Sequence, residues 1–403
     1  MMNRRVVVTG VGVITSIGTG REVFWNNLIA GKNGISPVTT FNTDEYEFHN
    51  GGEVKDFAPE KYMPAVFIKD AARASRFAVA SAVMAVADSG IKTGGSRIGA
   101  IVGTTMADIQ SLEQINKYWV RQGEESVWAA NVVKYPGNKL SNQIGYCLGL
   151  RGLNSVIPTA CSAGNYSIGY SYDLIRKGQY DIMLTGGSDP MSRITFTGFS
   201  RLFAMAPEKC QPFDKNRKGM MVGEGAGMLV LEELGSAKKR GAEIYAEIAG
   251  YGLSCDARHM TAPDVNGIEK VMRKALKNSG INEGEVDYIS AHGTGTPAND
   301  KAETEAIKRV FGGYSKKLAV SSIKSMLGHT MGAASAIEAV SCCLAVKNGV
   351  IPPTINYETV DPECDLDCVA NEARSKNMNV VLNNSLAFGG NNACLAFKKY
   401  TGV

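Results

Sequence analysis

Short apolar runs alternate with longer segments of helical spacing along most of the chain. The short runs are rich in Val, Ile and Ala and are bounded by Gly, Pro or polar residues, which is typical of buried strands. This alternation predicts an α/β layered fold. Strands are expected over residues 4–8, 97–102, 181–185, 227–232, 245–249, 286–290, 317–320, 380–384 and 394–398, and helices over 69–89, 165–177, 267–279, 300–311 and 333–348.

Two long segments repeat one order of elements. Residues 155–189 read as a strand, a turn with Cys161, a small-residue helix and a strand that ends in two glycines. Residues 318–390 repeat that order, with His329 in the turn. A duplication of this kind brings the two turns together about a pseudo-twofold axis. We therefore expect two halves: residues 1–246 with the cysteine, and residues 247–403 with two candidate catalytic histidines.

Composition narrows the possible functions. A chain of 403 residues suits two domains or one duplicated domain, and 20% charged and 44% hydrophobic residues are ordinary for a soluble protein. The net charge of +4 is too small to indicate nucleic-acid binding. The apolar stretch 77–87 is far shorter than the ~20 residues that span a membrane. The nine cysteines are scattered without a C-x-x-C pair, so we expect reduced thiols, no metal site and a cytoplasmic location.

Two glycine-rich runs imitate nucleotide-binding loops. The first, GVG at residues 10–12, lacks the third glycine of the dinucleotide fingerprint, because position 15 is Thr15. The second, GEGAG at residues 223–227, leads into a strand-like run instead of a helix. Both are better explained by tight turns or close packing, so nucleotide binding is rejected.

The most informative run is TACSAG at residues 159–164. A β-leaning stretch precedes it and a small-residue helical segment follows, which places Cys161 at a strand-to-helix turn. Free N–H groups and the helix dipole favour a thiolate at such a position. We therefore expect Cys161 to be a nucleophile with a lowered pKa.

Two of the four histidines lie in dense Gly/Ser/Thr motifs. His292 lies in SAHGTGTP at residues 290–297, and His329 ends KSMLGH at residues 324–329. His49 and His259 have no such context and are expected to be ordinary residues. One cysteine with two histidines leaves several chemistries open. A cysteine protease would leave one histidine unused, whereas carbon–carbon bond formation uses both, with the imidazoles stabilising an enolate.

At this point the motifs resemble a known family. The three runs above, together with GEGAG at 223–227 and NSLAFGGNN at 384–392, resemble the β-ketoacyl-acyl-carrier-protein synthases. The resemblance covers residues 4–399 and is to the elongating type II group and the similar ketosynthase subunits of type II polyketide systems. Initiating synthases carry Asn in place of the second His, thiolases use a second Cys, and chain-length factors lack the nucleophilic Cys.

The resemblance implies a thiolase-like fold, with two duplicated halves in a five-layer α-β-α-β-α sandwich. It implies a decarboxylative Claisen condensation, in which Cys161 holds the acyl chain while His292 and His329 serve decarboxylation of malonyl-acyl carrier protein. The product would be a β-ketoacyl-acyl carrier protein in fatty acid chain elongation. Lys324 and Glu338 would support the site, and two such groups in an apolar core should be paired.

Further contacts follow from the same resemblance. The backbone N–H groups of Cys161 and Phe388 would form an oxyanion hole, and the Phe388 ring would act as a gate. Thr294 and Thr296 would bind the phosphopantetheine arm of the acyl carrier protein, which delivers the substrates. The enzyme itself would bind no cofactor. Acidic carrier proteins would dock on basic residues, for which the candidates are Lys69, Arg73, Arg76 and Arg201.

Two departures from the family pattern keep alternatives open. Leu386 and Ala387 replace the usual Phe and Gly, and Ala387 narrows the conformational freedom of the gate loop. The segment 103–108 has few of the glycines and aliphatic residues usual in the acyl pocket. The chain could instead be the catalytic subunit of a type II polyketide or polyene synthase. It would then form a heterodimer with a chain-length-factor-like subunit rather than a homodimer. A non-catalytic partner is a further alternative, against which Cys161 argues.

Overall fold

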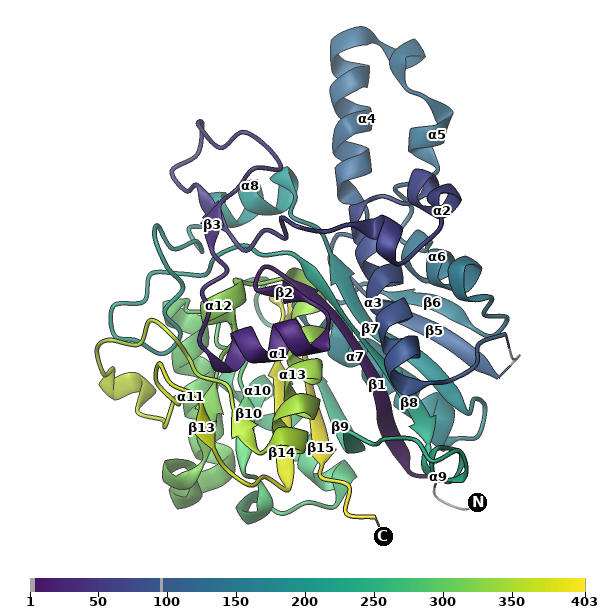
Figure 1. Cartoon of the computed structure of the whole chain (residues 1–403). Coiled ribbons are helices and arrows are strands. Elements are labelled where there is room, and N and C mark those ends of the chain that lie inside the picture. The colour runs from purple at the N-terminus through teal and green to yellow at the C-terminus, as the bar shows by residue number, and fades with distance from the viewer. Residues whose placement is uncertain (1–3, 95–96, 403) are drawn as a thin grey trace.

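The computed structural model describes residues 4–94 and 97–402. Its core is an eleven-stranded sheet, counted over those residues, whose strands run through the middle of the molecule (Figure 1). One half-sheet has the order β6-β5-β7-β8-β1, and the other has the order β9-β15-β14-β10-β11. Ten of the strands are β1 (Val6–Thr15), β5 (Ile98–Gly103), β6 (Asn154–Ile157), β7 (Ile182–Asp189), β8 (Gly225–Glu233), β9 (Ala246–Cys255), β10 (Tyr288–Ser290), β11 (Ala319–Ser321), β14 (Val380–Ser385) and β15 (Asn391–Lys398). The eleventh, the short strand β2 (Gly18–Thr19), pairs with the end of β1.

The two half-sheets repeat one another strand for strand. In each, two parallel pairings at the outer end are followed by antiparallel pairings toward the centre. This repetition confirms the predicted duplication. The halves are nevertheless not separate sheets, because Val6–Val8 of β1 pairs with Ala246–Ile248 of β9.

The helices complete five layers. Helices α3 (Arg73–Ser89) and α6 (Lys139–Leu148) cover the outer face of the first half-sheet. Helices α10 (Val265–Ser279) and α11 (Pro297–Phe311) cover the second. Between the half-sheets lie α7 (Ala163–Arg176) and α13 (Ala334–Asn348), and α13 is buried along almost its whole length. The five-layer thiolase-like arrangement is therefore confirmed.

Close packing explains the glycines that imitate a nucleotide loop. Gly10 and Gly12 lie inside strand β1 with no turn between them, although the register with β8 shifts between Val8 and Gly10. A Cβ atom at Gly10 would lie 2.3 Å from the carbonyl oxygen of Ala85, and one at Gly12 would lie 1.9 Å from that of Ser81. Only glycine lets α3 approach the strand so closely, so the close-packing interpretation is correct and the tight-turn interpretation is wrong here.

The helix predicted over residues 69–89 is in fact two helices. Helix α2 (Ala65–Asp70) ends before the extended residue Ala71, whose φ is −102° and ψ 134°, and α3 begins at Arg73. Hydrophobic spacing alone could not show this break, because two alanines fit a helix or an extended segment equally well by pattern.

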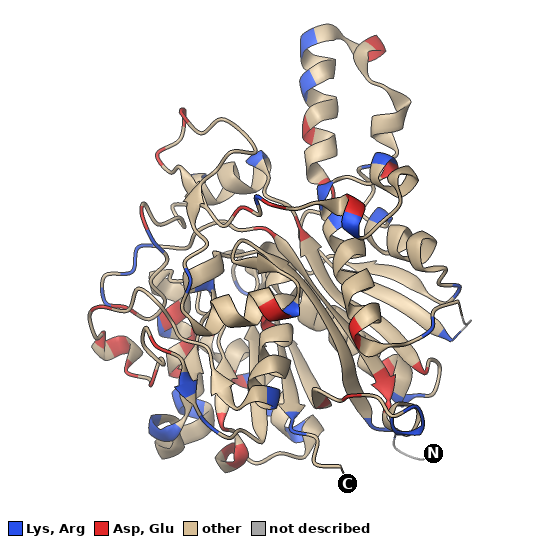
Figure 2. Ribbon diagram, viewed as in Figure 1, with Lys and Arg blue, Asp and Glu red and all other residues tan. Residues whose placement is uncertain are grey.

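A projecting arm is the main feature that the sequence pattern missed. It consists of α4 (Ile109–Gln122) and α5 (Ala129–Val132) and stands away from the sandwich (Figure 1). Charged residues otherwise gather on outer helices and loops, with few on the central strands (Figure 2). Among the described residues no helix is long and apolar enough to cross a membrane. The remaining elements are α1 (Arg21–Ile29), α8 (Arg193–Arg201), α9 (Leu234–Lys239), α12 (Lys324–Leu327), β2 (Gly18–Thr19), β3 (Ser36–Pro37), β4 (Asn50–Gly51), β12 (Val350–Ile351) and β13 (Arg374–Ser375).

Candidate active site

Cys161 lies where the sequence places it, between β6 and α7. It is the middle residue of the 3₁₀ turn η3 (Ala160–Ser162), directly before the first turn of α7. The preceding residue, Ala160, has a φ of +49°, a conformation that non-glycine residues rarely adopt. The backbone N–H groups of Phe388 and of Cys161 itself face the sulfur. Both predicted oxyanion donors thus lie close enough to act on the thiol, and their role as an oxyanion hole stays a prediction.

The thiol is protonated in the resting protein, contrary to the expectation from sequence. Burial raises the pKa of Cys161 to about 11, and the nearby Asp189 carboxylate adds to that rise. The ammonium of Lys324 and the N–H group of Phe388 act in the opposite direction, but burial outweighs them. A helix start favours a thiolate only where water or a counter-ion also solvates it, and Cys161 is only 5% exposed.

His329 has a defined tautomer. Its Nδ1 atom accepts a hydrogen bond from the backbone N–H of Met331 at 3.2 Å, so the ring proton must sit on Nε2. Within the described part of the chain, Nε2 is buried without a hydrogen-bond partner. A buried N–H donor without a partner costs free energy, which indicates that a bound group accepts a hydrogen bond from it.

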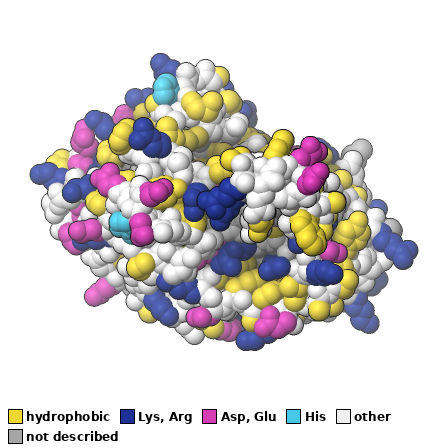
Figure 3. Space-filling view, turned by 90° about the horizontal axis from the view of Figure 1, so that it is seen from above, with side chains coloured by type: hydrophobic (Ala, Val, Ile, Leu, Met, Phe, Trp, Pro, Cys, Tyr) yellow, Lys and Arg dark blue, Asp and Glu magenta, His cyan; other side chains and the backbone are white. Residues whose placement is uncertain are grey.

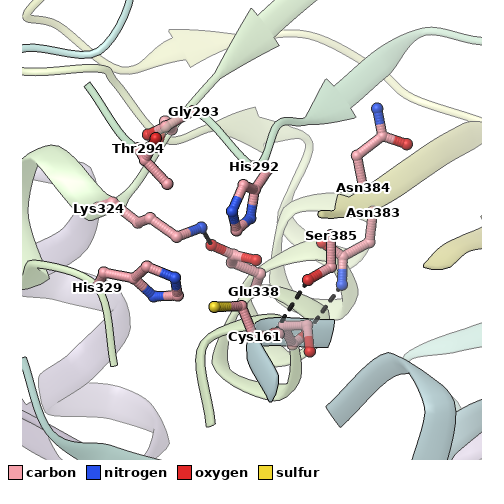
Figure 4. Close-up of polar contacts among 12 residues, drawn as sticks. Cys161, His292, Gly293, Thr294, Lys324, His329, Glu338, Asn383, Asn384 and Ser385 are labelled. Atoms are coloured by element: carbon pink, nitrogen blue, oxygen red, sulfur yellow. Dashed lines mark hydrogen bonds and ion pairs between the residues drawn. The ribbon is translucent and has the colours of Figure 1, made fainter. Parts of the chain in front are cut away.

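His292 is held through its backbone. Its N–H donates to Oε1 of Glu303 at 2.9 Å, and the next N–H, from Gly293, donates to Oε2 at 2.9 Å. The Nδ1 atom of the His292 ring is buried and has no partner among the described residues. The rings of His292 and His329 meet edge to face, with centroids 5.3 Å apart. Figure 4 shows both rings and the sulfur of Cys161 around one space.

Both imidazoles are neutral. Burial is the main cause that lowers the pKa of each ring well below 6.5, and the ammonium of Lys324 lowers both further. A neutral imidazole keeps one N–H donor and one acceptor, whereas an imidazolium would have only donors. Two neutral rings can therefore donate hydrogen bonds to a carbonyl oxygen that becomes an enolate oxygen.

Lys324 and Glu338 form a buried ion pair. The Nζ atom of Lys324 contacts Oε1 of Glu338, and both side chains are almost fully buried (Figure 4). Burial raises the pKa of Glu338 to about 7, although the charge of Lys324 opposes the rise. The expected pairing is present in the structure, and it places a cation beside both histidines.

Phe388 lies in a loop with two left-handed glycines. Gly389 has φ +83° and Gly390 has φ +78°, which glycine adopts without strain. Ala387 has φ −133° and ψ 150°, an extended conformation open to any residue, so the alanine causes no strain here. The Phe388 ring is half-buried and lies 5.6 Å from the ring of Phe199, measured between centroids.

One cavity joins these groups. Its walls include Cys161, both histidines and the hydroxyl-bearing residues Thr294 and Thr296. The two threonine Oγ1 atoms lie 2.9 Å apart. The structure thus brings the predicted nucleophile, histidines, threonines and gate residue into one cavity. Lys324 and Glu338 do not line it, but the charge of Lys324 acts on both histidines.

The predicted docking residues do not form one patch of free cations. Lys69 and Arg201 are exposed. Arg73 instead pairs with the fully buried Glu224, and its guanidinium also donates to the carbonyl oxygen of Val54. Arg76 is partly buried, and its guanidinium donates to the carbonyl oxygen of Ile68 at 2.8 Å. Docking through Arg73 stays a prediction, and the structure gives this residue a second task, because it holds the interior glutamate of the GEGAG run.

Sequence reasoning missed several residues that shape the site. Glu303 anchors the His292 turn, and Asp300 accepts a hydrogen bond from the N–H of Gly295 at 3.2 Å. Phe199 packs against the gate residue Phe388. Acidic residues on a predicted helix are normally solvated, so only the tertiary structure shows that both carboxylates are buried.

The fold and the site place a cysteine thiol and two neutral imidazoles in one cavity, an arrangement typical of the acyl-transferring class of enzymes. Family models support this class: the beta-ketoacyl synthase N-terminal domain matches residues 3–237, and the C-terminal domain matches residues 245–358. The chain belongs to the β-ketoacyl synthase family.

Proteins of similar sequence and structure support the same family assignment. The chain is 40% identical to 3-oxoacyl-[acyl-carrier-protein] synthase 2 of Synechocystis sp., with 98% of each chain covered. It is also 40% identical to nodulation protein E of Rhizobium sp., covering 99% of this chain and 100% of that one. A solved structure of the ishigamide ketosynthase/chain length factor is 45% identical, with a TM-score of 0.97, and covers 99% of this chain and 100% of that chain.

Proposed function

We propose that this chain catalyses a decarboxylative Claisen condensation on acyl carrier protein. In the first half-reaction the thiol of Cys161 attacks an acyl thioester, and the carrier leaves as its free thiol. In the second, malonyl-acyl carrier protein loses CO2, and the resulting enolate attacks the acyl-cysteine. Cys161 is released, and the product is a β-ketoacyl-acyl carrier protein.

A single observation carries this proposal. The thiol shares one cavity with the ring N–H donor of His329, which has no partner among the described residues. A protease or simple thioesterase needs one base and one oxyanion hole, whereas a second set of donors suits a second carbonyl group. The N–H groups of Cys161 and Phe388 serve the acyl-enzyme, and the two imidazoles serve the enolate.

The test separates the two half-reactions. Intact mass spectrometry follows acylation of the protein by acyl-carrier protein, and release of CO2 follows decarboxylation of malonyl-carrier protein. Cys161→Ala should abolish acylation but retain decarboxylation. His292→Ala and His329→Ala should lose decarboxylation. Acylation of the Cys161→Ala protein would place the nucleophile elsewhere, and normal decarboxylation in either histidine variant would contradict the two-imidazole mechanism.

Fatty acid chain elongation is the pathway that fits the names of the curated relatives. A second pathway is supported by the higher identity, 45%, to the ishigamide ketosynthase/chain length factor structure. In that case the chain would be the catalytic subunit of a type II polyketide or polyene synthase. Reconstitution with malonyl-carrier protein and reducing partners distinguishes them: saturated acyl chains made by the protein alone support elongation, and polyenes made only with a second subunit support the alternative.

The substrate arm would enter past the threonines. The hydroxyls of Thr294 and Thr296 face the cavity and suit the amide groups of a phosphopantetheine arm.

The protein surface seen from the side of the projecting arm has Lys and Arg side chains around a hollow (Figure 3). Arg201 is exposed on α8, the helix whose Phe199 lines the cavity. An acidic carrier protein fits such a surface. One solved relative is a type II PKS acyl-carrier protein in complex with its ketosynthase. It is 33% identical, with a TM-score of 0.91, and the match covers 99% of this chain and 100% of that chain.

The projecting arm fits a second ketosynthase-type subunit. It exposes a group of large apolar side chains, and one solved relative is described as a ketosynthase with a chain length factor. Such exposure on an isolated helical hairpin is unfavourable in water. Substituting Trp119 and Trp128 with Ser should convert the dimer to a monomer in light scattering, whereas Val360→Ser, at an exposed site outside the arm, should not. The exposed arm residues are Tyr118, Trp119, Val120, Trp128, Val132, Val133 and Tyr135.

A further inference from the structure

Asp189 is a fully buried carboxylate to which the mechanism above gives no role. Its Oδ1 atom accepts hydrogen bonds from the hydroxyl of Thr104 at 2.7 Å and from the N–H of Met106 at 2.8 Å. Its Oδ2 atom accepts from the N–H groups of Thr105 at 2.8 Å and Gly332 at 2.7 Å. Burial raises the pKa of Asp189 to about 6 although these four donors favour the charged form, so the group is an ionised carboxylate at neutral pH.

These hydrogen bonds join the two halves of the molecule. Thr104 to Met106 follow β5 in the first half. Gly332 belongs to the second half, in the 3₁₀ turn η6 (Met331–Ala333) that precedes α13. The two halves approach closely here, because a Cβ atom at Gly332 would lie 2.6 Å from the backbone of Thr104 and 2.7 Å from Oδ2 of Asp189.

The pseudo-twofold symmetry shows which position Gly332 occupies. Helix α7 begins at Ala163 and α13 begins at Ala334. The third residue before each start has a positive φ, +49° at Ala160 and +54° at Met331. The next residue is Cys161 in the first half and Gly332 in the second, so Gly332 is the counterpart of the nucleophile.

The strand register gives Asp189 a counterpart as well. Gly187 of β7 pairs with Gly103, and Asn383 of β14 pairs with Ser290, at the ends of equivalent ladders. Two residues beyond these positions lie Asp189 and Ser385. The Oγ atom of Ser385 donates to the carbonyl oxygen of Cys161 at 3.1 Å. Ser385, at the end of β14, therefore holds the turn before α7, and Asp189, at the end of β7, holds the turn before α13. In each case the turn belongs to the other half of the molecule.

The turn that Asp189 holds also sets the tautomer of His329. Gly332 follows Met331, whose N–H donates to Nδ1 of His329. Met331 has a positive φ, and a non-glycine residue keeps such a conformation only where its surroundings enforce it. The hydrogen bond from Gly332 to Asp189 is one such restraint, one residue away from the strained position.

We propose that Asp189 is a positioning residue for His329, because it fixes the turn that keeps the Nε2–H group of His329 directed into the cavity. Its catalytic consequence rests on the condensation proposed above. Without the carboxylate, Met331 relaxes toward negative φ, its N–H leaves Nδ1, and the ring proton distributes between both nitrogens. A donor misplaced by an ångström lowers the rate of the step it serves by about 100-fold.

The test uses Asp189→Ala and the isosteric Asp189→Asn, with Thr104→Val as the matched control. The control removes one donor to Asp189 and leaves the contact with Gly332. The chain has four histidines, so selective 15N-histidine labelling allows NMR to report the tautomer of each ring, assigned with single His→Gln variants. In the same variants we would measure decarboxylation of malonyl-carrier protein and alkylation of Cys161 by iodoacetamide.

We expect Asp189→Ala to mix the His329 tautomers and to lower kcat for decarboxylation by about tenfold or more, with a smaller change in the same direction for Asp189→Asn. Alkylation should not slow, because the Asp189 charge raises the Cys161 pKa and its loss favours the thiolate. The Thr104→Val protein should keep the wild-type tautomer. General damage to the fold would instead expose the Cys161 thiol and raise its alkylation rate toward that of the exposed Cys255.

A wild-type tautomer and wild-type kcat in the folded Asp189 variants would overturn the proposal, as would a loss of decarboxylation with an unchanged tautomer. If Asp189→Ala does not fold, Asp189→Asn decides by the same two measurements. If the wild-type protein itself releases no CO2, the proposed function fails, while the tautomer measurement still judges the positioning role.

Discussion

The ring of His292 meets the ring of His329 at an angle of 83°, with 5.3 Å between their centroids. Two imidazolium ions at this distance, beside the ammonium of Lys324, would repel strongly in a buried site. The close approach of the two rings is tolerated because both rings are neutral. Each neutral ring keeps one N–H group, and the two groups can donate to one oxygen atom.

The first prediction concerns acid pH. The pKa of both rings lies well below 6.5, so kcat for decarboxylation should persist as the pH falls through 6.5. The acid limb should appear only at lower pH, when the rings take up protons. The folded state prefers neutral histidines, so the stability they contribute is present above pH 6.5 and is lost as the pH falls below it. A pH profile of CO2 release tests this in the wild type and in Glu338→Gln, because Glu338 has a pKa of about 7 and titrates in the same range. An acid limb at or above pH 6.5 that persists in Glu338→Gln would contradict the prediction.

The second prediction concerns alkaline pH. Because the Cys161 pKa is about 11, its thiolate fraction should rise about tenfold per pH unit from about pH 7 to about pH 9. The rate of iodoacetamide alkylation, followed by peptide mass spectrometry, should rise in proportion. The exposed Cys255 provides an internal comparison in the same sample. A plateau for Cys161 below pH 8 would show a thiol activated in the resting protein.

The third prediction concerns the buried ion pair. Glu338→Gln leaves the Lys324 charge without its partner and should destabilise the fold by about 3–5 kcal/mol. Lys324→Met should cost less, because a carboxyl group with a pKa already raised to about 7 can take up a proton. Urea unfolding of both single variants and the double variant should give a coupling energy of about 1–3 kcal/mol. If the stability losses of the two single variants simply add up in the double variant, the ion pair contributes little to the stability of the fold.

The fourth prediction concerns the gate. Phe388→Ala should slow acyl transfer or condensation more than it lowers the melting temperature, because the ring is half-buried and borders the cavity. Its stability cost should stay below the roughly 3–5 kcal/mol of a fully buried phenylalanine. Phe203→Ala, at a ring that is 82% exposed, is the matched control and should leave both quantities nearly unchanged. If the Phe388→Ala protein is less stable but keeps its full kcat, the ring only packs in the fold and does not act as a gate.

The fifth prediction concerns the carrier protein. Reversing Lys69 and Arg201 together to Glu should raise KM for carrier-bound substrate and leave a pantetheine-thioester substrate almost unaffected. A double change is needed because single surface ion pairs contribute only about 0–1 kcal/mol. The pair Lys238→Glu and Lys239→Glu, on the exposed side of α9, controls for net charge. Equal KM increases in both double variants would mean that charge acts nonspecifically.

Arg73 is unsuitable for such a test, although the sequence suggested it. Its removal would leave the buried Glu224 without a counter-ion and damage the fold directly.

The sequence by itself determined the order of the strands, the duplication and the identity of the chemical groups. Alternation of apolar runs is a local property, so the strands at 182–189 and 380–385 could be placed from their own residues. The motifs around Cys161, His292 and His329 likewise consist of neighbouring residues.

Only the tertiary structure decided the state of those groups. Arg73 and Glu224 are 151 residues apart, and Asp189 and Gly332 are 143 apart, so no local pattern links them. The protonation of Cys161 depends on how deeply packing buries it, which outweighs the helix start that the sequence reveals. Burial and long-range hydrogen bonds arise only when the two halves close on each other, and they set the pKa of the thiol and the tautomer of His329.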